Sequence, residues 1–290
     1  MKILLLGSNG QVGFRLKDEL LSLGEVYATN RHDVDFEKPE TIQGTIQNFC
    51  PDVIVNAVAY TNVDGAESEP DKAYAVNAHA VKVIAEEAEK INALVIHYST
   101  DYVFDGLKDT PYTEEDIPNP LNTYGKSKLE GEKALQASKT PYLIFRTSGV
   151  YDNRGHNFVL TMKRLFKQRS ELKVIKDQYA SPTWARLIAS ATSQILSQFI
   201  IDGKFDINKA FDKKGIYHLT AAGSVSWYDF SCFLLRHFEK QDSVNIEPIP
   251  SDQYPQPAKR PCKPELSNGK TKNTFGISLP GWGEFCILNP

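Results

Sequence analysis

The chain has 290 residues, of which 41% are hydrophobic and 24% charged, and its formal net charge is −3. This composition is typical of a globular protein with a full hydrophobic core, and the length allows a main domain and a smaller lobe. The lack of an excess of basic residues argues against a nucleic-acid partner, and no segment is long and apolar enough to cross a membrane.

The four cysteines are scattered, without paired spacing and without a histidine nearby in a ligand pattern: Cys50, Cys232, Cys262 and Cys286. This usage predicts reduced thiols in a cytoplasmic protein and argues against a zinc site. The apolar start at residues 3–6 is too short for the core of a signal peptide.

The first 150 residues alternate between predicted strands and helices. Apolar runs predict strands at residues 3–6, 25–29, 51–57, 93–99 and 142–146. Helical spacing predicts helices at 14–21, 39–49 and 71–92, and a further helix that contains Tyr124 and Lys128. This alternation predicts an α/β fold with a doubly wound parallel sheet of the Rossmann type, which binds its ligands at the carboxyl ends of the strands.

The pattern loosens beyond residue 150. Helices are predicted at 157–169, 186–199 and 227–238, a short strand at 216–219, and an extended proline-rich segment at 248–264. We therefore expect a dinucleotide-binding domain over residues 1–150 and a mainly substrate-binding lobe over 151–290, with some segments of the lobe returning to the main sheet.

A glycine-rich turn joins the first strand to the first helix, and its residues are Gly7, Gly10, Gln11, Val12 and Gly13. A backbone without side chains can approach a pyrophosphate there, and the free amides of the helix N-terminus point at its charge. The GxxGxxG spacing resembles that of the extended short-chain dehydrogenase/reductase superfamily. Glycines at such a turn also occur for packing alone.

The end of the second predicted strand bears on the choice of cofactor. An acidic residue there usually holds the adenosine ribose, but this chain has Asn30 followed by Arg31. Because Arg31 could pair with a ribose 2′-phosphate, we expect NADPH, with NADH also possible. In the alternative, Arg31 is a solvated loop residue and Asp33 or Asp35 contacts the ribose.

Three residues predict proton transfer to a carbonyl. Thr100 follows the fourth strand, where its hydroxyl can bind a substrate carbonyl, and Tyr124 and Lys128 share one helix face four residues apart. Tyr124 would donate the proton as hydride reaches carbon, while Lys128 lowers the phenol's pKa and binds the nicotinamide ribose. Taken singly, these residues could be a strand-end cap and part of an amphipathic helix.

Longer motifs narrow the resemblance to the dTDP-4-dehydrorhamnose reductase family. They lie at residues 52–64, 97–106, 120–132, 181–183, 217–219 and 226–230. The resemblance implies reduction of the 4-keto group of dTDP-6-deoxy-L-lyxo-4-hexulose to dTDP-L-rhamnose. It further implies that the cofactor is lined by Gly10, Gln11, Val12, Asp35, Phe36, Ala59, Tyr60 and Thr61, and the sugar by Thr100 and Asp101.

The same resemblance suggests that Phe158 and Arg260 contact the nucleotide half of the substrate, since an aromatic ring can stack on a base and a guanidinium can pair with phosphate. Core packing and a surface charge are the alternative interpretations. Gly149 stands where the family usually has a tryptophan, which predicts a looser pocket or a different sugar.

Arg15 replaces a first-helix glutamate that some family members use for a magnesium-linked dimer, and the end of the chain after Gly283 lacks the helix expected there. We therefore expect no structural magnesium, and either a monomer or a homodimer.

Three alternative functions remain open on sequence alone. The chain could reduce another dTDP-4-keto-6-deoxy sugar, act as an epimerase that returns the hydride, or be a non-catalytic NADP-binding regulatory subunit. Intact Thr100, Tyr124 and Lys128 argue against a regulatory subunit, because a binding protein needs no proton donor.

Overall fold

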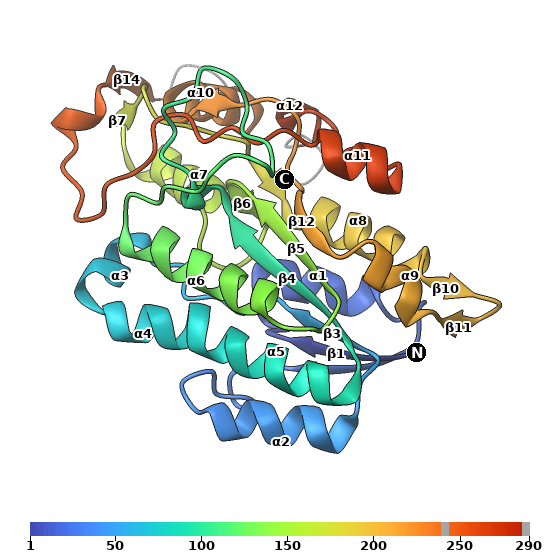
Figure 1. Ribbon diagram of the computed structural model, residues 1–290. Helices are drawn as coiled ribbons and strands as arrows, with labels where there is room; N and C mark the ends of the chain where they lie inside the picture. The colour runs from blue at the N-terminus through green and yellow to red at the C-terminus, as the bar shows by residue number, and fades with distance from the viewer. Residues whose placement is uncertain (239–243, 286–290) are drawn as a thin grey trace.

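The computed structural model describes residues 1–238 and 244–285, and a six-stranded parallel sheet forms its centre (Figure 1). The strand order is β12-β5-β4-β3-β1-β2. These strands are β1 (Lys2–Leu6), β2 (Glu25–Thr29), β3 (Val53–Asn56), β4 (Leu94–Thr100), β5 (Tyr142–Thr147) and β12 (Gly215–His218). The predicted doubly wound fold is confirmed.

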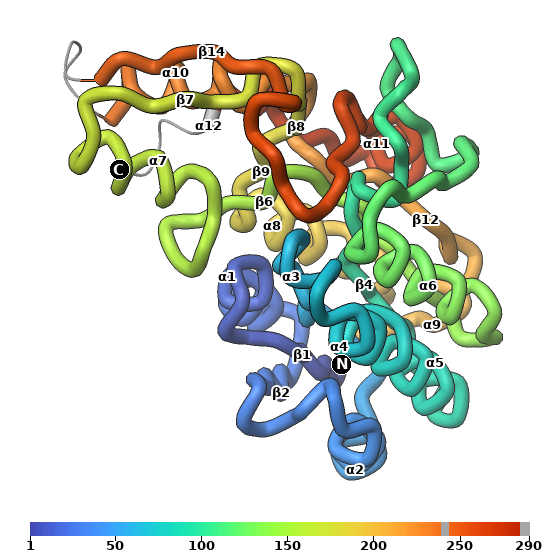
Figure 2. Tube along the Cα trace, turned by 90° about the vertical axis from the view of Figure 1, so that its left-hand side faces the viewer, coloured from blue at the N-terminus to red at the C-terminus, as the bar shows by residue number. Residues whose placement is uncertain are grey.

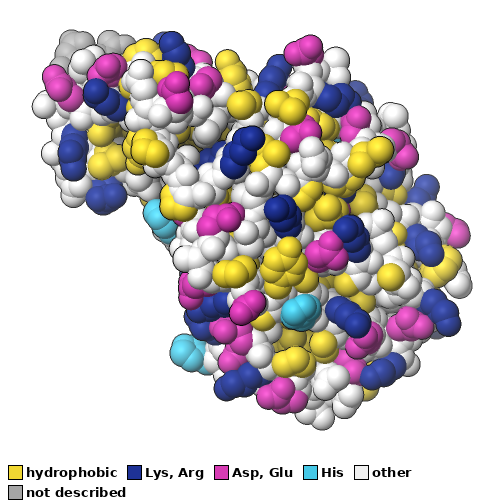
Figure 3. Space-filling view, turned by 60° about the vertical axis from the view of Figure 1, so that its left-hand side comes forward, with side chains coloured by type: hydrophobic (Ala, Val, Ile, Leu, Met, Phe, Trp, Pro, Cys, Tyr) yellow, Lys and Arg dark blue, Asp and Glu magenta, His cyan; other side chains and the backbone are white. Residues whose placement is uncertain are grey.

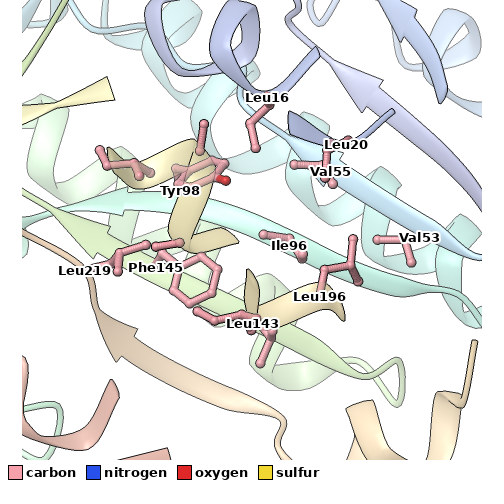
Figure 4. Packing of buried hydrophobic residues seen from close by; sticks show 14 of the residues in the cluster. Leu16, Leu20, Val53, Val55, Ile96, Tyr98, Leu143, Phe145, Leu196 and Leu219 are labelled. Atoms are coloured by element: carbon pink, nitrogen blue, oxygen red, sulfur yellow. The ribbon is translucent and has the colours of Figure 1, made fainter. Parts of the chain in front are cut away.

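Helices cover both faces of the sheet, and successive side chains of each strand enter the core on opposite sides. Leu5, Val55 and Ile96 pack on one face under α1 (Gln11–Glu19) and α8 (Ala185–Ser197), as Figure 4 shows for part of this cluster. Leu4, Ile54 and Val95 pack on the other face. That face is covered by α2 (Pro39–Phe49), α5 (Ala80–Ile91) and α6 (Thr123–Ala137). Burial on both sides explains why the strands are continuous apolar runs in the sequence.

The helix expected over residues 71–92 is interrupted. α4 (Pro70–Tyr74) passes through a wider π-helical turn, η1 (Ala75–His79), before α5 begins. α6 crosses this turn so closely that a Cβ on Gly131 would overlap the Asn77 backbone carbonyl oxygen. The Asn77 side chain bonds Tyr60 N and O and the Ser127 hydroxyl. The π turn therefore locks α6 to the segment that follows β3.

A smaller lobe lies to one side of the sheet (Figure 2) and projects beyond the larger body (Figure 3). Its core contains Tyr151, Phe166, Trp184, Phe230 and Leu234. Its helices are α7 (Phe158–Gln168) and α10 (Trp227–Phe238). Its paired strands are β7 (Glu171–Ile175) with β14 (Asn245–Ile249), β8 (Tyr179–Ala180) with β13 (Val225–Ser226), and β6 (Val150–Tyr151) with β9 (Thr183–Trp184).

Segments beyond residue 150 belong to both parts of the molecule. β12 pairs with β5 at the edge of the main sheet, and α8, α9 (Ile207–Asp212) and α11 (Gly269–Phe275) contribute to the core on one face of that sheet. The remaining elements are short: α3 (Val63–Ser68), η2 (Asp101–Val103), β10 (Ile200–Ile201), β11 (Lys204–Phe205), η3 (Ser251–Gln253) and α12 (Trp282–Phe285).

Two features of the C-terminal part differ from the sequence-based expectation. The proline-rich segment begins inside β14 and includes the 3-10 turn η3, so it is not extended throughout. Residues 283–285 belong to α12, where no terminal helix is expected from the sequence, whereas the rest of the predicted tail, residues 286–290 with Cys286, lies outside the described residues. Within the described part of the chain, no helix has the length and apolarity needed to cross a bilayer.

Candidate active site

A cavity of about 610 Å³ lies at the carboxyl ends of the central strands and extends to the smaller lobe. It brings together residues from distant parts of the chain: Gly10, Gln11, Val12, Ala59, Thr61, Thr100, Asp101, Tyr124, Lys128, Gly149 and Phe158. Ligands of open α/β sheets bind at this edge. The cavity therefore unites the predicted cofactor turn with the predicted proton-transfer residues.

Thr100 and Asp101 lie where β4 passes into η2. The Thr100 hydroxyl accepts a hydrogen bond from Tyr102 N at 3.1 Å and donates one to Asp101 Oδ1 at 3.1 Å. Ser148, just after β5, donates its hydroxyl to Asp101 Oδ2 at 2.6 Å. Burial raises the pKa of Asp101 to about 6, against the opposing effect of these hydrogen bonds. Asp101 is thus a buried carboxyl that can change its protonation state close to neutral pH.

Tyr124 and Lys128 lie in the first turns of α6. The helix begins at Thr123, and the Asn122 side chain caps it by accepting a hydrogen bond from Gly125 N at 2.8 Å. Gly125 lacks a side chain where a Cβ would overlap the Tyr102 carbonyl oxygen, so α6 packs directly on η2. As a result the Tyr124 and Tyr102 rings meet edge to face, with centroids 5.7 Å apart.

Burial dominates the acid–base properties of this pair. It raises the pKa of Tyr124 to about 12, and a hydrogen bond with Thr100 opposes the shift. The spacing of Tyr124 and Lys128 predicts that Lys128 lowers this pKa, but the shift is upward, and Lys128 Nζ donates to the Tyr98 carbonyl at 2.7 Å. Burial lowers the pKa of Lys128 to about 8, while Glu132 acts in the opposite direction. At neutral pH Tyr124 therefore retains the proton that a general acid must donate.

The glycine-rich turn has the geometry needed to hold a pyrophosphate. Gly7 adopts a φ of +87°, which side chains disfavour, and a Cβ on Gly13 would overlap the Gly7 carbonyl oxygen. Gly10 caps α1 without any side-chain hydrogen bond to the first amides. Those amides can therefore bind an anion at the helix N-terminus.

Two buried hydroxyls fit the nicotinamide end of a dinucleotide. Within the described residues, Ser99 Oγ and Thr147 Oγ1 have no hydrogen-bond partner, and both residues line the large cavity near Lys128. A buried polar atom without a partner is costly, and a polar ligand group can satisfy it. From the sequence, both residues are placed at the carboxyl ends of predicted strands, where ligands bind, but neither is assigned a role there.

A second cavity of about 280 Å³ continues from the glycine-rich turn to the end of β2. Gly7, Asn30, Arg31, Asp35, Phe36, Ala59 and Tyr60 line it. The Arg31 side chain is 79% exposed and lies 3.5 Å from the Glu37 carboxylate. Asp33 is not among the lining residues and instead accepts a hydrogen bond from Asn30 N at 2.9 Å. Asp35 and Arg31 both remain available to an adenosine ribose.

Phe158 and Arg260 lie around a third cavity, of about 450 Å³, against the smaller lobe. Phe158 packs against Trp227 with ring centroids 4.4 Å apart, so it also belongs to the core of that lobe. Arg260 forms a two-pronged ion pair with Asp64 of α3, with contacts of 3.0 and 2.8 Å. Any phosphate that reaches Arg260 must therefore share the guanidinium with Asp64.

Gly149 and Arg15 are the two residues at which the sequence departs from the family pattern. Gly149 lines the large cavity with a φ of +55°, and a Cβ there would lie 3.1 Å from Pro182 Cα. Arg15 forms two hydrogen bonds of 2.6 and 2.7 Å with the buried Asp152 carboxylate. The guanidinium of Arg15 thus links α1 to the smaller lobe.

Known proteins resemble this chain over nearly its whole length. The family model described as RmlD substrate binding domain matches residues 1–286. A curated dTDP-4-dehydrorhamnose reductase from Escherichia coli (strain K12) is 44% identical over 290 residues, which cover 97% of this chain and 94% of the relative.

Solved structures show the same similarity. A dTDP-4-dehydrorhamnose reductase from Clostridium acetobutylicum superposes with a TM-score of 0.89 at 36% identity, covering 99% of this chain and 97% of that one. A dTDP-4-dehydrorhamnose reductase from Bacillus anthracis, solved in complex with NADP, has a TM-score of 0.87 at 32% identity and covers 98% and 96% of the two chains.

Proposed function

This chain belongs to the RmlD substrate binding domain family, and from that membership we propose that it is a dTDP-4-dehydrorhamnose reductase. It reduces the 4-keto group of dTDP-6-deoxy-L-lyxo-4-hexulose to give dTDP-L-rhamnose, with NADPH as reductant. The observation that carries the proposal is the convergence of Thr100, Tyr124 and Lys128 with the glycine-rich turn in one cavity.

The cofactor would lie along the two cavities that meet at the glycine-rich turn. The helix N-terminus suits the pyrophosphate, and the cavity beside Arg31 and Asp35 suits the adenosine ribose. Ser99, Thr147 and Lys128 offer polar groups at the nicotinamide end. When bound, the cofactor supplies a hydride to the carbonyl carbon. NADPH is preferred because Arg31 can pair with a 2′-phosphate, and the B. anthracis relative was solved with NADP.

The residues of the chain supply the proton and hold the substrate. Thr100 is suited to bind the keto oxygen, and Tyr124 to donate its phenolic proton to that oxygen as negative charge develops. In its protonated form Lys128 can stabilise the phenolate that remains, because a nearby ammonium favours an anion. Asp101 would contact the sugar, while Phe158 and Arg260 would contact the nucleotide half in the third cavity.

A specific observation favours reduction of a different dTDP-4-keto-6-deoxy sugar as the second candidate. Gly149 contributes no side chain to the cavity wall, so the hexose meets less steric restriction there. An epimerase of the same fold would return the hydride and leave the cofactor without net oxidation. A regulatory subunit would bind NADPH and leave the sugar unchanged.

We also expect a cytoplasmic protein that acts as a monomer or homodimer and has no nucleic-acid partner. The net charge of −3 and the three described free cysteines, Cys50, Cys232 and Cys262, support this expectation.

The direct test is loss of NADPH absorbance when enzymatically prepared dTDP-6-deoxy-L-lyxo-4-hexulose is added, with the product identified by NMR. Formation of dTDP-L-rhamnose is the expected result. NADPH binding without oxidation of the cofactor would contradict the proposal. Lys128→Met is expected to lose turnover, whereas Lys126→Met, on the exposed side of the same helix, serves as the matched control.

A further inference from the structure

Lys128 is held by a chain of hydrogen bonds that crosses from β3 to β4. Asn56 and His97 face each other in the register of these two strands. Val58 N donates to Asn56 Oδ1 at 3.0 Å, and Asn56 Nδ2 lies 3.1 Å from His97 Nδ1. At the other side of the ring, His97 Nε2 lies 3.3 Å from Lys128 Nζ. Lys128 Nζ in turn donates to the Tyr98 carbonyl at 2.7 Å.

The backbone N–H of Val58 fixes the direction of these hydrogen bonds. The Val58 N–H can only donate, so it requires the oxygen of the Asn56 amide and leaves the NH₂ group facing His97. That group cannot accept a hydrogen bond, so His97 Nδ1 must be the acceptor and the ring proton must be on Nε2. His97 is completely buried, and burial lowers its pKa well below the usual value, so the ring is neutral.

The contact between His97 and Lys128 needs one donor and one acceptor. The Nε2–H of His97 points at Lys128 Nζ, and only an uncharged amine has a lone pair to accept it. An ammonium would place two donors against each other at this contact. The bond to the Tyr98 carbonyl is compatible with either form of Lys128, because both carry N–H groups.

We propose that His97 is a positioning residue that orients Lys128 and, by donating its Nε2–H to the amine nitrogen, favours the uncharged form of that lysine. Asn56 acts through His97 by selecting the tautomer. The effect on the reaction rests on the proposed role of Lys128 beside Tyr124. The hydrogen-bond direction itself does not depend on that role.

The other polar groups around Lys128 do not supply this effect. Glu132, one turn further along α6, favours the ammonium, and it is paired with Arg146 of β5 at 2.6 Å. On η1, which packs against α6, the polar group is the neutral Asn77 amide, which donates to the Ser127 hydroxyl. Asp101 of η2 is bonded by Ser148, and Glu67 of α3 accepts from Thr123 N. His97 is therefore the group whose donor opposes protonation of Lys128.

Two NMR measurements on the protein without substrate test the proposal. In ¹⁵N-histidine-labelled protein, long-range ¹H–¹⁵N correlations are expected to show His97 protonated on Nε2. In protein labelled at lysine ¹³Cε, with Lys128 assigned by Lys128→Arg, His97→Leu is expected to raise the pKa of Lys128 by about 1, as loss of one hydrogen bond predicts.

Asn56→Asp provides a second, nearly isosteric variant. Its carboxylate can accept from His97 Nδ1–H, which turns Nε2 into an acceptor for the ammonium and reverses the chain. The pKa of Lys128 is expected to rise more in this variant than in Asn56→Asp/His97→Leu, where only the through-space charge remains. Thermal melts establish that each variant is folded before its titration is interpreted.

An Nδ1–H tautomer of His97, or an unchanged Lys128 titration in both folded single variants, would overturn the proposal. Either result is obtained without turnover, so it is separable from failure of the proposed reductase activity. If the reductase activity holds, the alkaline limb of the pH profile of kcat is expected to move upward with the pKa of Lys128 in His97→Leu. A purely structural role would lower kcat without moving that limb.

Discussion

Replacing Gly131 with alanine tests whether the close crossing of α6 over the π turn positions the catalytic residues. Gly131 lies one turn beyond Lys128, and its added Cβ would overlap the Asn77 carbonyl oxygen. Ordinary carbon–oxygen contacts are about 3.3–3.6 Å, so α6 must retreat by roughly 1 Å to accommodate the methyl group. Because Tyr124 and Lys128 lie on the same helix, both side chains move with it.

The expected cost has two parts. Overpacking lowers the free energy of unfolding by about 1–3 kcal/mol, partly offset by the gain of about 0.5–1 kcal/mol that alanine brings to a helix interior. A displacement of about 1 Å at reacting groups lowers kcat by up to about a hundredfold. Urea denaturation followed by circular dichroism measures the first effect, and NADPH oxidation with the dTDP-keto sugar measures the second.

Gly44→Ala is the matched control, because Gly44 is also a helical glycine but nothing lies within 4 Å of its added Cβ. It is expected to stabilise the protein slightly and to leave kcat unchanged. If Gly131→Ala is as stable as the parent protein, the overlap with Asn77 is not real. If it is less stable but equally active, α6 does not transmit the displacement to Tyr124.

Three further variants test the proton donor, the buried carboxyl and the sugar pocket. Tyr124→Phe is expected to abolish turnover while NADPH affinity stays nearly unchanged. Tyr27→Phe, which alters an exposed ring, is the control. Full activity of Tyr124→Phe would refute the role of Tyr124 as proton donor. The folded-state pKa of Asp101, about 6, lies above its usual value, so stability is expected to fall by up to roughly 3 kcal/mol as pH rises from about 4 to 6. Asp101→Asn should flatten that part of the curve of unfolding free energy against pH, and an identical curve would contradict the shift. Gly149→Trp is expected to lower the free energy of unfolding by about 1–2 kcal/mol, because φ is +55° at this position. It is also expected to raise the substrate KM. A stability in urea equal to that of the parent protein would show that the backbone relaxes freely.

The Rossmann sheet could be predicted because short sequence patterns define its strands and helices. β2 and α2 begin and end at the residues expected from the sequence, since a short apolar run and helical spacing each fix an element without reference to the rest of the chain. The residues at the strand ends could be assigned to one site because parallel strands bring their carboxyl ends to the same edge.

The features that could not be predicted depend on contacts between distant segments. The π turn at Ala75–His79 accompanies the close approach of α6, to which the local sequence of residues 71–92 gives no clue. The upward pKa shift of Tyr124 reflects its burial, with its ring against Tyr102 of η2, which a spacing of four residues does not reveal. The link between Asn56 and His97 requires the register of β3 against β4.

The start of α1 is joined to the start of α7 by a single amide. Asn157 caps α7 by accepting from Leu160 N at 3.0 Å, and its Nδ2 donates to Gln11 Oε1 at 2.7 Å. Gln11 follows the glycine-rich turn, whereas α7 lines the cavity assigned to the nucleotide sugar. A ligand that shifts α7 therefore also changes the environment of the turn. Because linkage is reciprocal, if the sugar nucleotide changes the affinity for the dinucleotide by some factor, the dinucleotide changes the affinity for the sugar nucleotide by the same factor.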